Sequence, residues 1–240
     1  MGPVIDAPRF PPLLVGEEAA AGQDPFAKAV ARAALGTEAG RVVWSSDLQT
    51  ARAAMVLAPE VALELAVTVA FAHLLGLGDA MGALAPPETA VHFDWPAGLR
   101  VNAARCGGIR AAAATQDLAA VPGWLVIGIE VPIKPPAETA PGRAPDRTWL
   151  CEEGCGEITA PALIDTWARH TLLWINTWEE RGIGPLHEAW RARAWGLGEP
   201  LADGSGVFMG LDETCGQLIK TATGTELRRL APAILGGAMR

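Results

Sequence analysis

The stretch VHFDWPAGLRVNAARCGGIRAA, residues 91–112, decides the predicted fold of this chain. It divides into three short segments, with a Trp95-Pro96 pair at the first corner and Gly107 and Gly108 in the last segment. Glycine lets a backbone approach a ligand or another strand closely, because it carries no side chain. We therefore predict three short strands that fold back on one another as a tight meander.

The segments before the meander predict an α+β domain. A helix is expected from Asp24-Pro25 to Gly36, followed by a strand over GRVVWS (40–45) and a second strand in QTARAAMVLAPE that ends at Pro59. The apolar stretch 59–78 then predicts a helix that has Pro59 and Glu60 in its first turn and ends at Gly76. This stretch lacks a polar stripe, which indicates burial on most of its faces.

The segments after the meander continue the same pattern and then change. GWLVIGIEVPI (123–133) predicts an inner strand, and the proline-rich residues 134–147 predict a surface loop. A long helix is expected between Thr159 and Gly182, then a shorter one over 185–196. Beyond residue 198 the pattern predicts strands over 205–210, 215–222 and 226–234. We thus expect a main domain over 1–195 and a small β domain over 196–240.

Composition and charge limit the classes of partner. The formal net charge of −8, without a lysine- or arginine-rich run, argues against nucleic-acid binding. No basic segment followed by an apolar one marks a secretory signal, and the longest uncharged run, between Glu64 and Asp79, is too short to span a bilayer. Four irregularly spaced cysteines are typical of reduced thiols. The expectation is a cytoplasmic protein with no nucleic-acid or membrane partner.

Three motifs lie in order along the meander and the inner strand: Trp95-Pro96-Ala97-Gly98, Arg105-Cys106-Gly107-Gly108-Ile109 and Gly128-Ile129-Glu130-Val131-Pro132-Ile133. They resemble the catalytic domain of biotin protein ligases and lipoate ligases. That family carries Trp-Pro-Asn-Asp at the corner, Lys-(Leu/Ile)-(Ala/Ser)-Gly-Ile in the next strand and Gly-(Ile/Leu)-Gly-(Ile/Leu)-Asn-Val in the inner strand.

Two later segments extend the resemblance. TWEERGIGPLHEAW (177–190) is similar to the last helical region of the family's catalytic domain, and GVFMGLDETCGQLIK (206–220) is similar to its C-terminal domain. The resemblance implies a biotin ligase or class II synthetase-like mixed sheet with flanking helices. It also implies that the small β domain is an SH3-like barrel.

The resemblance further implies a reaction. Such ligases form an acyl-adenylate from a carboxylic acid and ATP, with magnesium, and transfer the acyl group to a lysine of a carrier protein. The implied acids are biotin, lipoate or octanoate-like compounds, and the implied partner is an acyl-carrier protein or a biotin or lipoyl domain. Because a carboxylate and a phosphate repel each other, the site must neutralise both anions. In the family, a strand lysine and an arginine- and glycine-rich loop have this role.

This chain departs from the family pattern at the positions of chemistry. Arg105 stands at the position of the family's strand lysine. It keeps the positive charge, but on a planar, forked guanidinium group. Only SSDLQ (45–49) occupies the place of the arginine-rich loop, and Ala97-Gly98 replaces the corner Asn-Asp. Glu130 and Pro132 stand where glycine and asparagine are expected. A carboxylate at Glu130 would disfavour anions unless a cation such as Arg105 pairs with it.

Two hypotheses remain open at this stage. The first is a divergent ligase in which Arg105 is the catalytic, anion-stabilising residue. Its predicted ligand-binding residues are Trp95, Asn102, Gly107, Gly108 and Glu130. The second is a catalytically silent relative that binds an acyl ligand or a partner protein.

Three cysteines allow further interpretations. Cys106 is either a thioester-forming nucleophile, polarised by His92 and Asp94, or a small buried strand residue, which is the commoner case. Cys151 and Cys155 have the spacing of metal ligands, but His170 is the only third candidate in view. We therefore predict no metal site.

Overall fold

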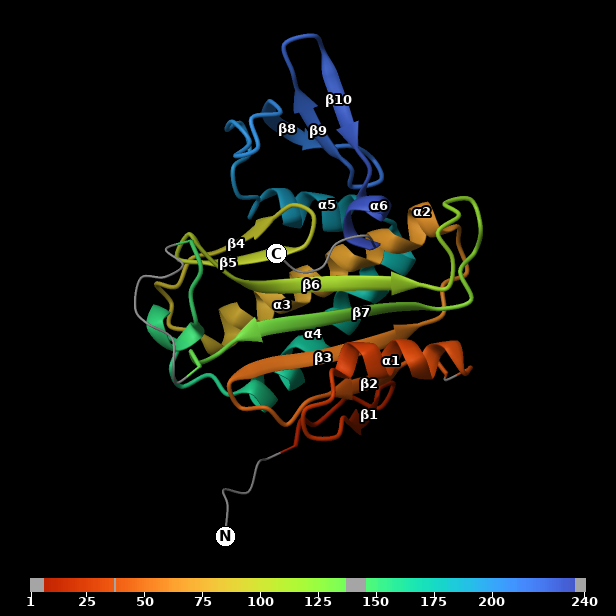
Figure 1. Ribbon diagram of the computed structural model, residues 1–240, viewed down its shortest axis with the longest axis vertical. Helices are drawn as coiled ribbons and strands as arrows, with labels where there is room; N and C mark the ends of the chain where they lie inside the picture. Colours follow the sequence, from red (N-terminus) through yellow and green to blue (C-terminus); the bar gives the residue numbers. More distant parts are fainter. Residues whose placement is uncertain (1–6, 37, 137–145, 236–240) are drawn as a thin grey trace.

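The computed structural model describes residues 7–36, 38–136 and 146–235, and within them a mixed sheet lies between helices (Figure 1). The sheet has the strand order β1-β2-β3-β7-β6-β5-β4, and only the β1-β2 pair is parallel. Its strands are β1 (Val15–Glu18), β2 (Arg41–Trp44), β3 (Thr50–Leu57), β4 (Val91–Asp94), β5 (Gly98–Val101), β6 (Ala104–Ala113) and β7 (Leu125–Pro132). The predicted α+β class with flanking helices is confirmed.

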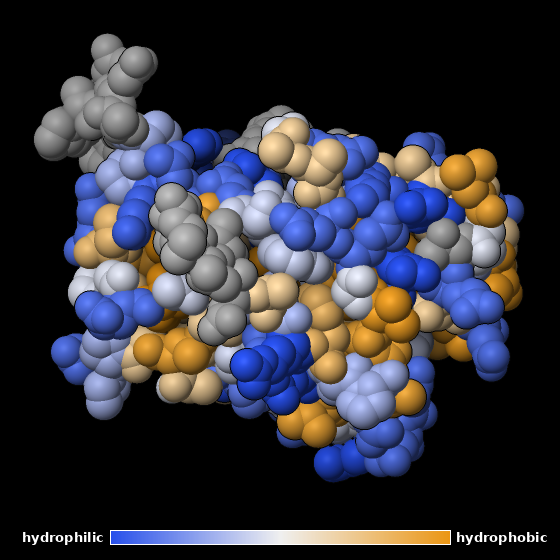
Figure 2. Space-filling model, turned by 90° about the horizontal axis from the view of Figure 1, so that it is seen from below, coloured by the Kyte–Doolittle hydropathy of each residue, from blue (hydrophilic) through white to orange (hydrophobic). Residues whose placement is uncertain are grey.

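The meander and the inner strand form as predicted. β4, β5 and β6 are joined antiparallel, and β7 lies between β3 and β6. Strand β1 was not predicted, because as an edge strand it lacks the alternation of buried and exposed residues that reveals a strand. Polar and charged side chains cover most of the face beside β1, with apolar ones in small groups between them (Figure 2).

Two long helical regions cover one face of the sheet and enclose the main core. The first comprises α2 (Leu63–Ala66), a 3-10 turn (Val67–Val69) and α3 (Ala70–Leu84), and the second is α4 (Ala160–Arg181). Residues 63–84 are long and apolar enough to cross a membrane, with a mean hydropathy of 1.5, but 83% of that window is buried in the fold. They therefore form a core helix.

The bounds of this first helical region differ from the prediction. It begins at Leu63 rather than Pro59, because the N–H groups of Leu63 and Glu64 bond to carbonyls of the 115–122 loop. It continues past Gly76 to Leu84, because Gly76 is a packing residue and not a helix end. A Cβ at Gly76 would lie 2.4 Å from Thr171 Oγ1 and 2.7 Å from the Thr171 backbone nitrogen of α4. Glycine allows the two helices to pack this closely.

The opposite face of the sheet is covered by α1 (Pro25–Ala34), which forms a smaller apolar cluster with β2, β3 and β7. Asp24 caps this helix as predicted, and its carboxylate accepts a hydrogen bond of 3.0 Å from the Phe26 N–H. The Phe26 ring lies against Gly128 of β7, where an added Cβ would meet it at 2.6 Å. Thus a glycine in the inner strand determines how closely α1 approaches the sheet.

The C-terminal part is a second, smaller sheet, drawn in blue in Figure 1. Its antiparallel strands are β8 (Val207–Leu211), β9 (Gln217–Lys220) and β10 (Thr225–Arg228), and it is preceded by the 3-10 turn Leu150–Glu153, α4 and α5 (Gly184–Arg191). Within the described residues this sheet is not closed into the predicted barrel. The strand predicted over 226–234 ends at Arg228, and α6 (Leu230–Leu235) follows, because Leu230, Ala231 and Ile234 are buried on one helical face.

Two glycines of α3 offer a matched test of the close helix contact. Gly76→Ala should lower the free energy of unfolding by about 1–3 kcal/mol, because its methyl group would overlap the backbone of α4. Gly82→Ala should leave stability unchanged or raise it by up to about 1 kcal/mol, because its site is open and alanine favours a helix. Urea denaturation of both variants measures the difference, and equal stabilities would contradict the packing role of Gly76.

Candidate functional site

The corner of the meander is fixed against the C-terminal part of the chain. The Trp95 indole Nε1 donates a hydrogen bond of 2.9 Å to the Cys215 carbonyl oxygen in the turn between β8 and β9. The backbone N–H of Trp195 donates a hydrogen bond of 2.9 Å to the Phe93 carbonyl oxygen, and the Trp195 ring contacts the His92 ring edge-on. These contacts hold β4 and its corner beside the segment that leads into the small sheet.

A cavity of about 1240 Å³ lies between this corner, the end of β7 and the C-terminal part. Its volume exceeds the range of about 300–1,000 Å³ that is usual for sites of drug-sized ligands. Side chains of the described residues line this cavity and do not fill it. The lining residues used below are Asp94, Trp95, Arg100, Arg105, Gly107, Glu130, Arg147, Leu201, Phe208 and Gln217.

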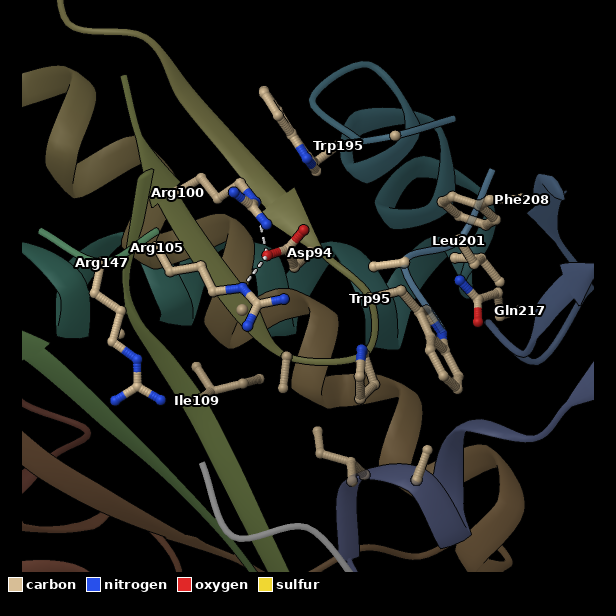
Figure 3. Close-up of a pocket in the computed structure, with 18 of the residues that line it drawn as sticks. Asp94, Trp95, Arg100, Arg105, Ile109, Arg147, Trp195, Leu201, Phe208 and Gln217 are labelled. Carbon is tan, nitrogen blue, oxygen red and sulfur yellow. Dashed lines mark hydrogen bonds and ion pairs between the residues drawn. The ribbon is translucent and has the colours of Figure 1, made fainter. Parts of the chain in front are cut away.

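Three arginines line one end of this cavity (Figure 3). The Asp94 carboxylate lies between two of them, with Oδ2 2.7 Å from Arg100 Nε and 3.5 Å from Arg105 Nε. Arg105 also lies 3.7 Å from Asp146, and its side chain is 43% exposed. Arg147 follows Asp146 and forms no ion pair with any residue that the structure describes. Arg105 and Arg147 are therefore the cations that an anionic ligand can reach.

Glu130 also lines the cavity, but its cation is not Arg105. Arg52, directly opposite on β3, places NH2 3.2 Å from Glu130 Oε1 and NH1 3.3 Å from Asp47 Oδ2. The prediction that Arg105 pairs with Glu130 is therefore wrong, because Arg52 on the adjacent strand is the partner of Glu130. The Glu130 charge is thus compensated without using the arginines of the cavity.

Gly107 and Gly108 are required by the chain's own backbone. Gly107 has φ of 84°, and an added Cβ would lie 2.0 Å from the Glu130 carbonyl oxygen. Gly108 has φ of 152°, and its Cβ would lie 2.2 Å from the Ala97 carbonyl oxygen. Gly107 lines the cavity, whereas Gly108 lies behind the corner and is not part of the cavity wall. These glycines bring β6 close to β7 and to the corner.

Asn102 lies away from the cavity, at the turn between β5 and β6. Its Oδ1 accepts from the Ala90 N–H at 3.0 Å, and its Nδ2 donates to Glu153 Oε2 at 2.9 Å. Its φ of 46° lies in the left-handed region that asparagine tolerates better than most residues. Asn102 therefore lies in a turn outside the cavity. The other predicted residues that line the cavity lie together in its wall: Trp95, Arg105, Gly107 and Glu130.

The thiol of Cys106 lies inside the core. Its pKa is raised to about 12, mainly because burial disfavours the thiolate, with Glu153 as a further cause. His92 and Asp94 are engaged by Trp195 and Arg100 respectively. Since the thiolate is the nucleophilic form, the arrangement does not activate Cys106. Among the described residues, no group of three His, Cys, Asp or Glu side chains could hold a metal ion.

The connection between β2 and β3 is short, as the sequence indicated. Ser45 donates its N–H to Arg52 O at 3.0 Å, and Asp47 accepts from the Gln49 N–H at 2.8 Å. These bonds close residues 45–49 into a tight turn. An arginine-rich loop is absent from this place.

Most of the lining residues were not predicted from the sequence, among them Arg100, Arg147, Phe208 and Gln217. Arg100 alternates with apolar neighbours and looks like an ordinary surface strand residue. Arg147 ends a proline-rich segment, and the other two belong to a sheet that was interpreted as a separate domain. No local motif marks these residues, because their role comes from tertiary packing.

Comparison with known proteins identifies the family. The model of the biotin/lipoate A/B protein ligase family matches residues 10–192. This chain belongs to that family. It is 25% identical over 190 residues to the biotin–[acetyl-CoA-carboxylase] ligase of Paracoccus denitrificans, covering 76% of this chain and 79% of that protein.

Solved structures show the same fold. A biotin protein ligase-like protein of unknown function from Silicibacter sp. TM1040 is 46% identical, with a TM-score of 0.88 over 95% of this chain and 99% of that one. The biotin protein ligase of Aquifex aeolicus, in complex with biotin and ATP, has a TM-score of 0.69 at 16% identity, over 90% and 95% of the two chains. The mixed sheet with its flanking helices is therefore the biotin protein ligase fold.

Burial of the cysteines predicts their reactivity. At pH 8 the thiols of Cys106 and Cys215 should remain unreacted in the folded protein, because burial raises both pKa values far above the solution pH. Titration with a disulfide reagent should label Cys151, which is only half-buried, and label all four cysteines after denaturation. Rapid labelling of Cys106 in the native state would contradict this assignment.

Proposed function

We propose that this protein is a divergent ligase of its family that activates a small carboxylic acid with ATP and transfers the acyl group to a protein lysine. The observation that supports this proposal is the open cavity, with Arg105 and Arg147 at one end and Trp95 in its wall. A relative that binds no ligand would have no need to keep such a cavity free of side chains. We also propose that residues 196–240 form a small C-terminal domain.

The arginines suit the first step of this chemistry. A carboxylate oxygen attacks the α-phosphorus of ATP, the bond to the β-phosphate breaks, and pyrophosphate leaves. Arg105 would lower the repulsion between the two anions, since its fork can bond both oxygens of a carboxylate or phosphate. In the second step a lysine amine attacks the acyl carbonyl and AMP leaves. Magnesium would arrive on the phosphates of ATP, and no step here is assigned to a metal held by the protein.

The second candidate is a catalytically silent relative that holds an acyl ligand or a partner protein. The tight turn over residues 45–49 favours this silent relative, because the ligases that this chain resembles carry an arginine-rich loop at the same place. This candidate shares the cavity and differs from the first only in lacking turnover.

Acid-dependent formation of pyrophosphate and AMP distinguishes the two candidates. Purified protein, ATP and magnesium are incubated with biotin, lipoate or octanoate, with and without a carrier domain. We expect one acid to stimulate product formation. No stimulation by any acid, from protein shown to be folded, would contradict the ligase and favour the silent relative.

Substitution of Arg105 tests the residue directly. Arg105→Ala should lower the acid-dependent rate by about a hundredfold or more, because a charge that faces the reacting anions is lost. Arg105→Lys should keep part of the rate, since the charge remains while the fork is lost. Arg181→Ala, at the exposed end of α4, is the matched control and should keep the wild-type rate. A wild-type rate for Arg105→Ala would remove Arg105 from the mechanism.

A further inference from the structure

The end of the cavity remote from Arg147 is built by the C-terminal part of the chain. Leu201, Phe208 and Gln217 face Trp95 across this end (Figure 3). Pro232, Ala233 and Ile234 of α6 complete the wall. The lining of this end is thus mostly apolar and aromatic, in contrast to the arginines at the other end.

Gln217 is the buried polar residue of this wall, which also includes the exposed carboxylate Glu199. Its side chain points into the cavity although the residue is only 4% exposed. Its amide makes no hydrogen bond to any residue within 7–36, 38–136 or 146–235. The amide atoms are not among the described side-chain atoms that are fully buried without a partner, since they face the cavity. Within the part of the chain that the structure describes, the amide oxygen and N–H groups of Gln217 are therefore not used by the protein and can meet a molecule in the cavity.

The surroundings of Gln217 hold it in place. Gln217 begins β9 and lies between Leu211 of β8 and Arg228 of β10, so its backbone is fixed on both sides. Trp95 is fixed by the hydrogen bond from its indole to Cys215 O, two residues before Gln217. The Gln217 amide beside the rings of Trp95 and Phe208 suits a planar ligand group. Such a group can pack on the rings and form hydrogen bonds with the amide.

We propose that Gln217 recognises a planar ligand group that carries a hydrogen-bond donor next to an acceptor, while the anionic part of the same ligand lies at Arg105 and Arg147. Two sources have this chemistry. One is the base of ATP, since glutamine bonds the donor and acceptor edge of adenine in bidentate fashion. The other is a carboxylic acid whose tail contains a cyclic amide or urea. The inference rests on the acid and ATP site of the proposed function, but binding alone tests it.

Direct titration of the folded protein with ATP, biotin and octanoate separates these sources. Gln217→Leu removes both hydrogen-bonding atoms at similar size, and Gln217→Glu keeps the shape but removes the donor. Gln116→Leu, at an exposed loop position, is the matched control. Gln217→Leu should weaken one ligand about tenfold and change the octanoate affinity less than twofold, because octanoate has no such group. Gln217→Glu should weaken the same ligand at least as much, and its octanoate affinity measures the repulsion from the added charge.

The pattern of losses identifies the group. Weaker binding of ATP alone assigns the base, and weaker binding of biotin alone assigns the tail of the acid. Unchanged affinities for both ligands in Gln217→Glu and Gln217→Leu, or no binding of either by the wild type, would overturn the inference. Gln217-dependent binding without any acid-dependent AMP would contradict the ligase proposal and leave this inference standing.

Discussion

The hydrogen bond from the Trp95 indole to the Cys215 carbonyl joins the two parts of the molecule that enclose the cavity. The meander corner is a loop tip and would otherwise have freedom to move. With its largest side chain fixed to the β8–β9 turn, the corner becomes a rigid wall shared by both sheets. Both sheets contribute to the wall of the cavity, and this hydrogen bond is one of the contacts that hold them together there.

Charge in the cavity is arranged so that cations remain available at one end only. Asp94 restrains Arg100 at 2.7 Å and contacts Arg105 more loosely at 3.5 Å. Glu130 is compensated by Arg52 on the adjacent strand. Asp94 and Glu130 therefore repel an anion less strongly than their sequence positions suggest, because each of these two carboxylates lies beside a guanidinium. The remaining positive charge lies where β6 and the segment before the Leu150–Glu153 turn meet.

The sequence was informative where local pattern determines structure. The Thr159 cap, the Asp24-Pro25 helix start and the apolar run of β7 each depend on neighbours in the chain, and all three form as predicted. Gly76 was misinterpreted as a helix end because its partner, Thr171, is distant in sequence. Asn102 was assigned to the ligand from its position in the meander, but only the fold shows it bonded to Ala90 and Glu153. Arg147 and Gln217 have no local signal, since two separate segments must fold before they face one cavity.

The tight turn between β2 and β3 has a consequence for kinetics. Residues 45–49 are already held by hydrogen bonds of their own, so a ligand would not have to order this segment, and binding would not carry the entropic cost of closing a loop there. The arginine-rich loop that closes over acid and adenylate in the ligases that this chain resembles is missing at residues 45–49, so it cannot exclude water from the arginine end. A reactive acyl-phosphate formed there would have a lifetime set by the competition between hydrolysis and the arrival of an acceptor amine.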